Sequence, residues 1–246
     1  MPFRLAVLEC DTPVPSVEKE RGSYGAIFET LLSKGTSVDF RLLKYDVVRQ
    51  HTYPSTADVD GILITGSTNS PAEHTAFADD AWIVQLVSYI RSVLNTSRTP
   101  VVGICFGHQV IARALGATTA VARGGWEVSV SRVDLSPDGQ KLFGASSLNL
   151  HQMHRDEVAS VPEGLVCLGS SARCPVQGMY KRKTVFSLQA HPEFDGFIME
   201  QILRARRDQG IFGEDMFGEA VGRAGDAHDG TLVAGKIWDF FLDAVA

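Results

Sequence analysis

Cys105 lies at the centre of residues 103–107, which read Gly-Ile-Cys-Phe-Gly. The apolar run 100–104 precedes it, and a helical pattern over 107–115 follows it. In such a strand-to-helix turn the glycines allow neighbouring backbone to pass close to the turn. The positive N-terminal end of the following helix stabilises a thiolate. The same turn aims the backbone N–H of Phe106 toward a developing oxyanion. The pattern predicts a nucleophile, with a buried structural cysteine as the equal alternative on this segment alone.

A thiol nucleophile needs a base that is close in space but distant in the sequence. His191 directly follows the predicted strand 184–189, and the carboxyl ends of parallel strands are where active sites assemble. Glu193, two residues further on, can orient the imidazole and stabilise its charged form. Alone, this His-Pro-Glu segment is more typical of a capped turn, but combined with the cysteine turn it favours catalysis. His108, next to the cysteine turn, is the alternative base.

Short apolar runs alternate with helical patterns in the first half of the chain. This alternation predicts an α/β fold with a mostly parallel central sheet covered by helices on both faces. The expected strands are residues 3–9, 38–43, 61–65 and 100–104, and the expected helices are 23–34, 78–94 and 107–115.

The second half of the chain predicts a small antiparallel extension of that sheet. From 118 to 190 the apolar runs are short and are separated by turn residues such as Ser-Pro-Asp-Gly at 136–139. Helices over 196–208 and 231–244 are expected to complete one domain spanning 1–246. The glycine-rich and acidic stretch 209–230 is predicted to be a surface insertion.

The sequence resembles the class I, or triad, glutamine amidotransferases over about residues 3 to 208. The resemblance rests on Gly-Ile-Cys-Phe-Gly-His-Gln at 103–109, His-Pro-Glu at 191–193, Ile-Thr-Gly-Ser at 64–67 and His-Arg-Asp at 154–156. The Thr-Gly-Ser and Cys-Phe-Gly-His-Gln variants are most similar to stand-alone members, including γ-glutamyl peptidases and fungal or plant amidotransferase-like proteins. The resemblance implies a flavodoxin-like sheet.

By this resemblance, Cys105 is the nucleophile, His191 the acid and base, and Glu193 its orienting carboxylate. The backbone N–H groups expected to form the oxyanion hole belong to Gly66, Ser67 and Phe106. The residues expected to line the substrate pocket are Gln109, His154, Asp156 and Trp126. Ser67 departs from the Gly-Gly-Pro that is common in the family, which leaves the detailed geometry of the oxyanion loop open. A core position is the equal alternative for Trp126.

The implied activity is hydrolysis of a γ-glutamyl amide through a thioester on Cys105. The substrate would be glutamine, a glutathione-type compound or a γ-glutamyl peptide. A glutaminase that supplies ammonia to a separate synthase chain is one alternative. A binding or regulatory module without catalysis is another. The sequence contains no P-loop pattern G-x-x-x-x-G-K-[ST].

Composition argues against several other classes of protein. The net charge of −6 is unlike that of a nucleic-acid-binding protein, and no apolar run reaches the roughly 18 residues that a membrane span needs. The first ten residues predict a strand and not a signal peptide. The four cysteines lack CxxC spacing, which favours a reducing, cytoplasmic location. His151 and His154 could bind a metal, but no third ligand lies at a spacing typical of a metal site. We therefore expect no metal and no cofactor.

Overall fold

The computed structural model of the chain describes residues 1–67 and 80–245. Strands and helices alternate through the first half, as the sequence predicts, with an additional short helix after the first strand. The elements are β1 (Phe3–Glu9), α1 (Pro15–Arg21), α2 (Tyr24–Lys34), β2 (Phe40–Asp46), β3 (Gly61–Ile64), α3 (Ala81–Thr96), β4 (Val101–Ile104) and α4 (Phe106–Ala114). The first two residues of the helix expected over 78–94 lie outside the described residues.

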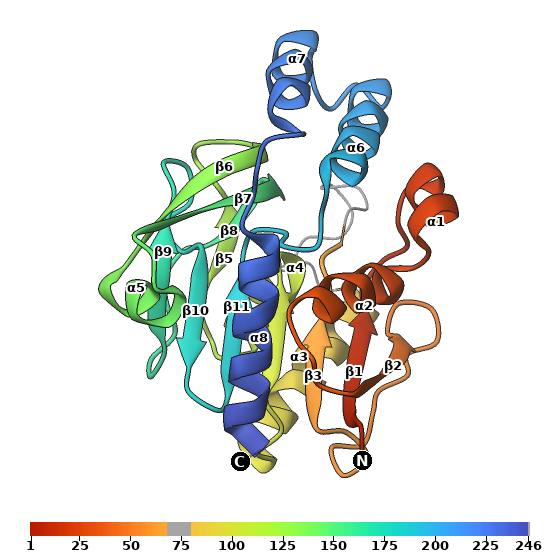
Figure 1. Cartoon of the computed structure of the whole chain (residues 1–246), viewed down its shortest axis with the longest axis vertical. Coiled ribbons are helices and arrows are strands. Elements are labelled where there is room, and N and C mark those ends of the chain that lie inside the picture. Colours follow the sequence, from red (N-terminus) through yellow and green to blue (C-terminus); the bar gives the residue numbers. More distant parts are fainter. Residues whose placement is uncertain (68–79, 246) are drawn as a thin grey trace.

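Short strands dominate the middle of the second half, and three helices end it (Figure 1). The elements are β5 (Thr119–Val121), β6 (Glu127–Leu135), α5 (Pro137–Phe143), β7 (Ser147–His154), β8 (Asp156–Val158), β9 (Val166–Ser170), β10 (Gly178–Lys181), β11 (Val185–Leu188), α6 (Gly196–Asp208), α7 (Glu214–Arg223) and α8 (Gly230–Val245).

Within the described residues, one nine-stranded sheet has the order β2-β1-β3-β4-β11-β10-β9-β6-β7. Neighbouring strands from β2 to β11 pair in parallel. From β11 to β7 every pair is antiparallel. A separate antiparallel pair joins β5 and β8. The expected parallel sheet with an antiparallel extension is therefore confirmed.

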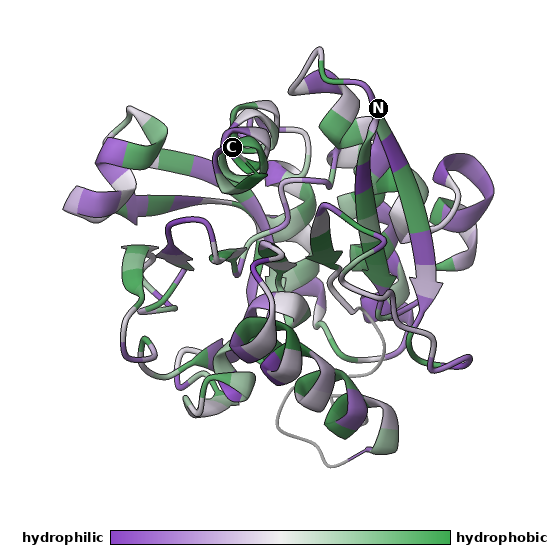
Figure 2. Cartoon of the chain, turned by 90° about the horizontal axis from the view of Figure 1, so that it is seen from below, coloured by the Kyte–Doolittle hydropathy of each residue, from purple (hydrophilic) through white to green (hydrophobic). Residues whose placement is uncertain are grey.

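Helices cover both faces of the parallel part because successive strand residues point to opposite faces. In β1, Leu5 and Val7 pack in the same cluster as residues of α2 and α8. Ala6 and Leu8, between and after them, pack with residues of α3 and α4 on the other side. Figure 2 shows the helices striped with hydrophilic and hydrophobic residues, as surface helices require. None of the helices in the described ranges is both long and apolar enough to cross a bilayer.

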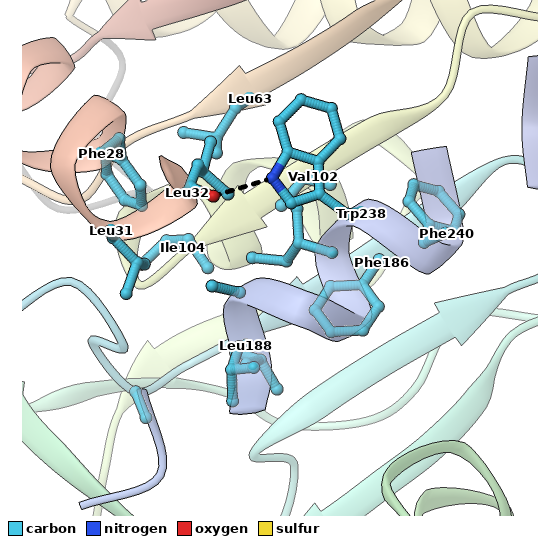
Figure 3. Packing of buried hydrophobic residues seen from close by; sticks show 14 of the residues in the cluster. Phe28, Leu31, Leu32, Leu63, Val102, Ile104, Phe186, Leu188, Trp238 and Phe240 are labelled. Atoms are coloured by element: carbon cyan, nitrogen blue, oxygen red, sulfur yellow. Dashed lines mark hydrogen bonds between the residues drawn. The ribbon is translucent and has the colours of Figure 1, made fainter. Parts of the chain in front are cut away.

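Trp238 anchors α8 against the sheet and α2 (Figure 3). Its indole ring lies edge-on to Phe3, with the ring centroids 5.4 Å apart. A buried indole N–H needs an acceptor, and here Nε1 donates to the backbone carbonyl of Leu32 over 3.1 Å. That bond joins the last helix of the chain to the first long one, which fixes the layer on this face.

Residues 136–139, expected to be a turn, begin helix α5 instead. Ser136 Oγ accepts a hydrogen bond from the backbone N–H of Gly139 over 3.1 Å, and Pro137 occupies the first helical position. Ser and Pro favour both turns and helix starts, so the local pattern did not separate the two. A turn over residues 182–184 joins β10 and β11.

The stretch 209–230, predicted to be a surface insertion, contains the helix α7. Phe212 and Ala220 are buried in a cluster with residues of α6 and β6. Asp229 holds the end of the stretch to β7, because its carboxylate accepts from the Asn149 N–H over 2.7 Å and its own N–H donates to the Asn149 carbonyl over 2.8 Å. The stretch is therefore ordered and packed.

The carboxyl ends of β3, β4 and β11 lie side by side, because the three strands are parallel neighbours. Gly66, Cys105 and His191 follow these three strands within a few residues. In Figure 1 this edge faces upward, toward α6 and α7. The topology thus brings together segments that are far apart in the sequence.

Candidate active site

Cys105 occupies the sharp turn between β4 and α4, with φ of 52° and ψ of −102°. This backbone conformation is rare for a residue with a side chain and is found mainly where surrounding structure enforces it. A Cβ on Gly103 would lie 2.6 Å from the Gly107 carbonyl carbon, and one on Gly107 would overlap the Ile64 carbonyl oxygen. Both glycines are therefore required by close backbone approach, as expected for this turn.

His191 and Glu193 form a buried pair. Nδ1 of His191 lies 2.7 Å from Oε1 of Glu193, and the two side chains are 1% and 0% exposed. The imidazole stacks on the Phe194 ring at a centroid distance of 4.0 Å and an interplanar angle of 7°. Its backbone N–H donates to the His151 carbonyl over 2.8 Å. These contacts fix the ring and make Nδ1 the nitrogen that faces the carboxylate.

The charge state of His191 depends on its two neighbours. Burial lowers the pKa of the imidazole, but the negative charges of Cys105 and Glu193 outweigh burial and raise this pKa to about 10. Nε2 is buried and has no hydrogen-bond partner within the described part of the chain. The ring can therefore carry a positive charge at neutral pH, with a protonated Nε2 available to a reacting group.

Gly66 lies against both Cys105 and His191. A Cβ at this position would lie 2.7 Å from His191 Cε1 and 3.5 Å from Cys105 Cβ. The cysteine, the histidine and this loop are therefore in direct contact around a position that only glycine can fill without displacement.

The segment that contains Gly66 is anchored on both sides. The Thr65 N–H donates to the Leu8 carbonyl over 3.1 Å, and Ser67 Oγ donates to Asp11 Oδ2 over 3.2 Å. Residues 68–79, which continue the loop, lie outside the described residues. Phe106, whose N–H is the other expected oxyanion donor, begins α4 and stacks its ring on Trp82 at 5.4 Å. The oxyanion roles of these backbone groups stay a prediction.

Three of the expected substrate-pocket residues belong to one hydrogen-bond network. Gln109 Nε2 donates to the Asp156 carbonyl over 2.9 Å, and His154 Nδ1 lies 3.0 Å from that same oxygen. The His154 side chain is buried. Burial raises the pKa of the Asp156 carboxyl to about 6, while Arg155 and His154 act in the opposite direction.

Trp126, the fourth expected pocket residue, lies on the side of α7. Its ring is edge-on to Phe212 at 5.1 Å, and the Arg155 guanidinium lies 5.9 Å from its centroid. Arg155 also lies 3.9 Å from Asp156 Oδ1, which connects Trp126 to the network. Trp126 and Met216 line an open groove of about 610 Å³. The indole therefore borders a surface groove and is not simply a core residue.

The structure argues against His108 as the base. Its Nδ1 lies 2.9 Å from Ser187 Oγ, inside the protein. Burial and the nearby His154 lower the pKa of His108 to about 3, so the ring is neutral and engaged elsewhere. His151 and His154, considered as metal ligands, lie on β7, where His154 binds Glu127 and Asp156.

Sequence reasoning missed two polar residues of the site, Gln189 and Glu127. Gln189 Nε2 lies 3.5 Å from Cys105 Sγ, within the range of a hydrogen bond to sulfur. Glu127 Oε2 lies 3.1 Å from His154 Nε2. Gln189 could have been found from strand alternation, because it is two residues before His191. No local signal distinguishes Glu127 from other strand residues.

Proteins of similar sequence are described as glutamine amidotransferases or γ-glutamyl peptidases. The family model described as glutamine amidotransferase class-I matches residues 22–204. A glutamine amidotransferase-like protein of Schizosaccharomyces pombe is 34% identical, over 99% of this chain and all of that protein. Gamma-glutamyl peptidase 3 of Arabidopsis thaliana is 32% identical, over 82% and 80% of the two chains.

Solved structures agree on the fold. A crystal structure of a glutamine amidotransferase from Thermotoga maritima covers 98% of this chain and 99% of its own, with a TM-score of 0.76 at 18% identity. The family model spans most of the chain, and the relative from S. pombe spans nearly all of it. The chain therefore belongs to the class-I glutamine amidotransferase family.

Proposed function

We propose that this protein hydrolyses γ-glutamyl amide bonds through a γ-glutamyl thioester on Cys105. The observation that carries the proposal is a buried imidazole whose pKa is raised by Cys105 and Glu193, at the edge of the sheet where the cysteine turn lies. A charged imidazole beside a thiolate is the arrangement that activates a cysteine nucleophile. Relatives named γ-glutamyl peptidases support the choice of bond.

In the first step the Cys105 sulfur forms a bond to the γ-carbonyl carbon, and the carbonyl electron pair moves to the oxygen. The N–H groups of Phe106 and of Gly66 or Ser67 would stabilise that oxyanion; removing one such donor typically costs about 3 kcal/mol of barrier. The carbon–nitrogen bond then breaks, and His191 Nε2–H gives its proton to the departing amine. The product on the enzyme is a thioester.

In the second step His191 acts as the base. The thiolate charge that supports the imidazolium disappears when the thioester forms, so burial then favours the neutral ring. Neutral Nε2 accepts a proton from water as the water oxygen attacks the thioester carbon. The carbon–sulfur bond breaks, glutamate leaves and the thiolate returns. Glu193 holds Nδ1 throughout and fixes the tautomer.

The leaving group distinguishes a peptidase from a glutaminase. We infer an amino acid or peptide amine, because the peptidase relatives are similar over about four fifths of this chain. The test compares kcat/KM for γ-glutamyl dipeptides, glutathione and glutamine. We expect the peptides to be cleaved fastest. Ammonia release from glutamine alone would assign a glutaminase, and failure to cleave any of them would refute the proposal.

Gly66→Ala is expected to lower kcat about 100-fold. The new methyl group would lie 2.7 Å from His191 Cε1, so the ring must move away from Cys105, and displacements of about 1 Å cost this much. Steady-state kinetics on the best γ-glutamyl substrate measure the effect. The control is Gly218→Ala, where a Cβ meets no atom within 4 Å. A Gly66→Ala enzyme with wild-type kcat would contradict the proposed geometry.

Asp156 is proposed to bind the ammonium group of the γ-glutamyl substrate. Its carboxyl pKa is raised to about 6, so the carboxylate is present above that pH and is lost as the pH falls below it. We expect KM to rise about tenfold between pH 7 and pH 5, following the fraction of ionised carboxyl.

Asp156→Asn separates this effect from other titrations. The variant should show a high KM that is nearly constant over the same pH range. Asp138→Asn, on exposed α5, is the control and should keep the wild-type profile. A wild-type KM profile in the Asp156→Asn enzyme would show that this carboxylate does not bind the substrate.

A further inference from the structure

A line of buried amides leads away from Cys105. Gln189 is fully buried, and its Nε2 lies 3.5 Å from the sulfur. Its Oε1 accepts from Gln109 Nε2 over 3.0 Å. The same Gln109 nitrogen donates to the Asp156 carbonyl over 2.9 Å. The sulfur of the proposed nucleophile is thus joined through two side-chain amides to a backbone oxygen.

His154 determines the far end of this line. Its Nδ1 lies 3.0 Å from the Asp156 carbonyl, and its Nε2 lies 3.1 Å from Glu127 Oε2. A carbonyl oxygen only accepts hydrogen bonds, so Nδ1 must carry a proton.

Glu127 Oε2 is a strong acceptor. It also accepts from Ser171 Oγ over 2.9 Å and from Gln177 Nε2 over 3.0 Å. These two donors and Nε2 of His154 converge on the one oxygen and hold the Glu127 side chain against the imidazole. His154 and Glu127 therefore form a buried hydrogen-bonded pair, with side chains 2% and 6% exposed.

His154 holds the Asp156 carbonyl in place, and this carbonyl sets the direction of every hydrogen bond in the line. An amide can present either its oxygen or its NH₂ group to a neighbour. The Asp156 carbonyl can only accept, so Gln109 must turn its NH₂ group toward it and toward Gln189. Gln189 must then turn its oxygen toward Gln109 and its NH₂ group toward Cys105. The sulfur consequently faces a donor, which stabilises a thiolate more than a thiol.

We propose that Gln189 is the hydrogen-bond donor that stabilises the Cys105 thiolate, and that Glu127 and His154 are positioning residues that orient it. The inference concerns the state of the thiol, and its kinetic consequence rests on the proposed function. Because the contacts run through Gln109, the effect of Glu127 on Cys105 must pass through Gln189. That dependence distinguishes this role from a general effect on stability.

The test measures the rate of alkylation of Cys105 by iodoacetamide at pH 7, mapped to its peptide by mass spectrometry. Only the thiolate reacts, so the rate reports the thiolate fraction. Gln189→Met keeps the length of the side chain but removes the donor. We expect alkylation and kcat to fall about tenfold, the usual loss for one hydrogen bond to a charged group, with KM within about twofold. Gln189→Glu places an acceptor against the sulfur and should react more slowly still.

A double-variant comparison tests the positioning role. Glu127→Gln alone should slow alkylation severalfold, but adding it to Gln189→Met should cause no further loss, because the pathway is already broken. Ser187→Ala is the control: Ser187 is buried on the same strand, and its side chain contacts His108. It should react at the wild-type rate, and melting temperatures verify that each variant is folded.

A wild-type rate of Cys105 alkylation in Gln189→Met would overturn the inference. A rate loss in the double variant equal to the product of the losses in the two single variants would also overturn it. If Glu127→Gln does not fold, the two Gln189 variants still show whether the hydrogen bond from Gln189 raises the alkylation rate of Cys105. The alkylation rate is independent of the substrate. A wild-type protein that cleaves no γ-glutamyl compound would therefore refute the proposed function. The alkylation rates would still decide the inference about Gln189.

Discussion

Cys105→Ala is expected to lower kcat for γ-glutamyl hydrolysis by about five orders of magnitude or more, because it removes the sulfur on which the proposed thioester forms. The measurement is product release from the best γ-glutamyl substrate at high enzyme concentration. The fold should tolerate the change, since alanine differs from cysteine only by the sulfur atom and the strained backbone is held by the contacts around Gly103 and Gly107.

Cys174→Ala is the matched control for this experiment. Burial raises the pKa of the Cys174 thiol to about 12, and its Sγ lies 3.6 Å from the Val176 carbonyl, so it is an inert structural cysteine. We expect turnover within about twofold of wild type, as for a substitution that touches no reacting group. Undiminished hydrolysis by Cys105→Ala would instead support a non-covalent mechanism or a different site. It would refute the assignment of Cys105 as the nucleophile.

His191→Gln is expected to lower kcat by about two to four orders of magnitude, the range typical of a lost general acid and base. Glutamine can keep a hydrogen bond to Glu193, but it cannot transfer a proton to the leaving amine. The variant should also slow alkylation of Cys105, because the positive charge beside the sulfur is gone. Stopped assays with γ-glutamyl dipeptides and the iodoacetamide rate measure the two effects separately.

His108→Gln is the control for His191→Gln. Both histidines are buried, but His108 has a pKa lowered to about 3 and a hydrogen bond to Ser187. We expect kcat to stay within about fivefold of wild type, because a neutral buried imidazole supplies no acid. The opposite ranking, with His108→Gln inactive and His191→Gln active, would identify a different hydrolase or isomerase chemistry whose base lies near the cysteine turn.

The parallel sheet and the cysteine turn could be predicted because their signals are local. Residues 100–104 are apolar on both faces, and the glycines around Cys105 match a strand-to-helix turn whose steric demands the structure confirms. Strand order brings His191 to the same sheet edge, and Glu193 lies two residues away. These residues could therefore be proposed together without coordinates.

Other parts of the site depend on information that a single sequence does not carry. Glu127 faces His154 because β6 and β7 pair antiparallel in a register that matches these two residues, which are distant along the chain. The orientation of Gln189 depends on the Asp156 carbonyl, which His154 contacts, through one further side chain, that of Gln109. Helix α7 was missed because its glycines and acids resemble a loop, and its helical state is stabilised by packing of Ala220 against α6 and β6.

The most direct test of the proposed mechanism is rapid acid quenching of the wild-type enzyme with a γ-glutamyl dipeptide, followed by peptide mass mapping. The predicted result is one γ-glutamyl group on the peptide that contains Cys105, formed within the first turnover and released by hydroxylamine as the γ-glutamyl hydroxamate. Rapid product formation with no adduct on any cysteine would contradict the thioester, and an adduct on Cys10, Cys167 or Cys174 would contradict the assigned nucleophile.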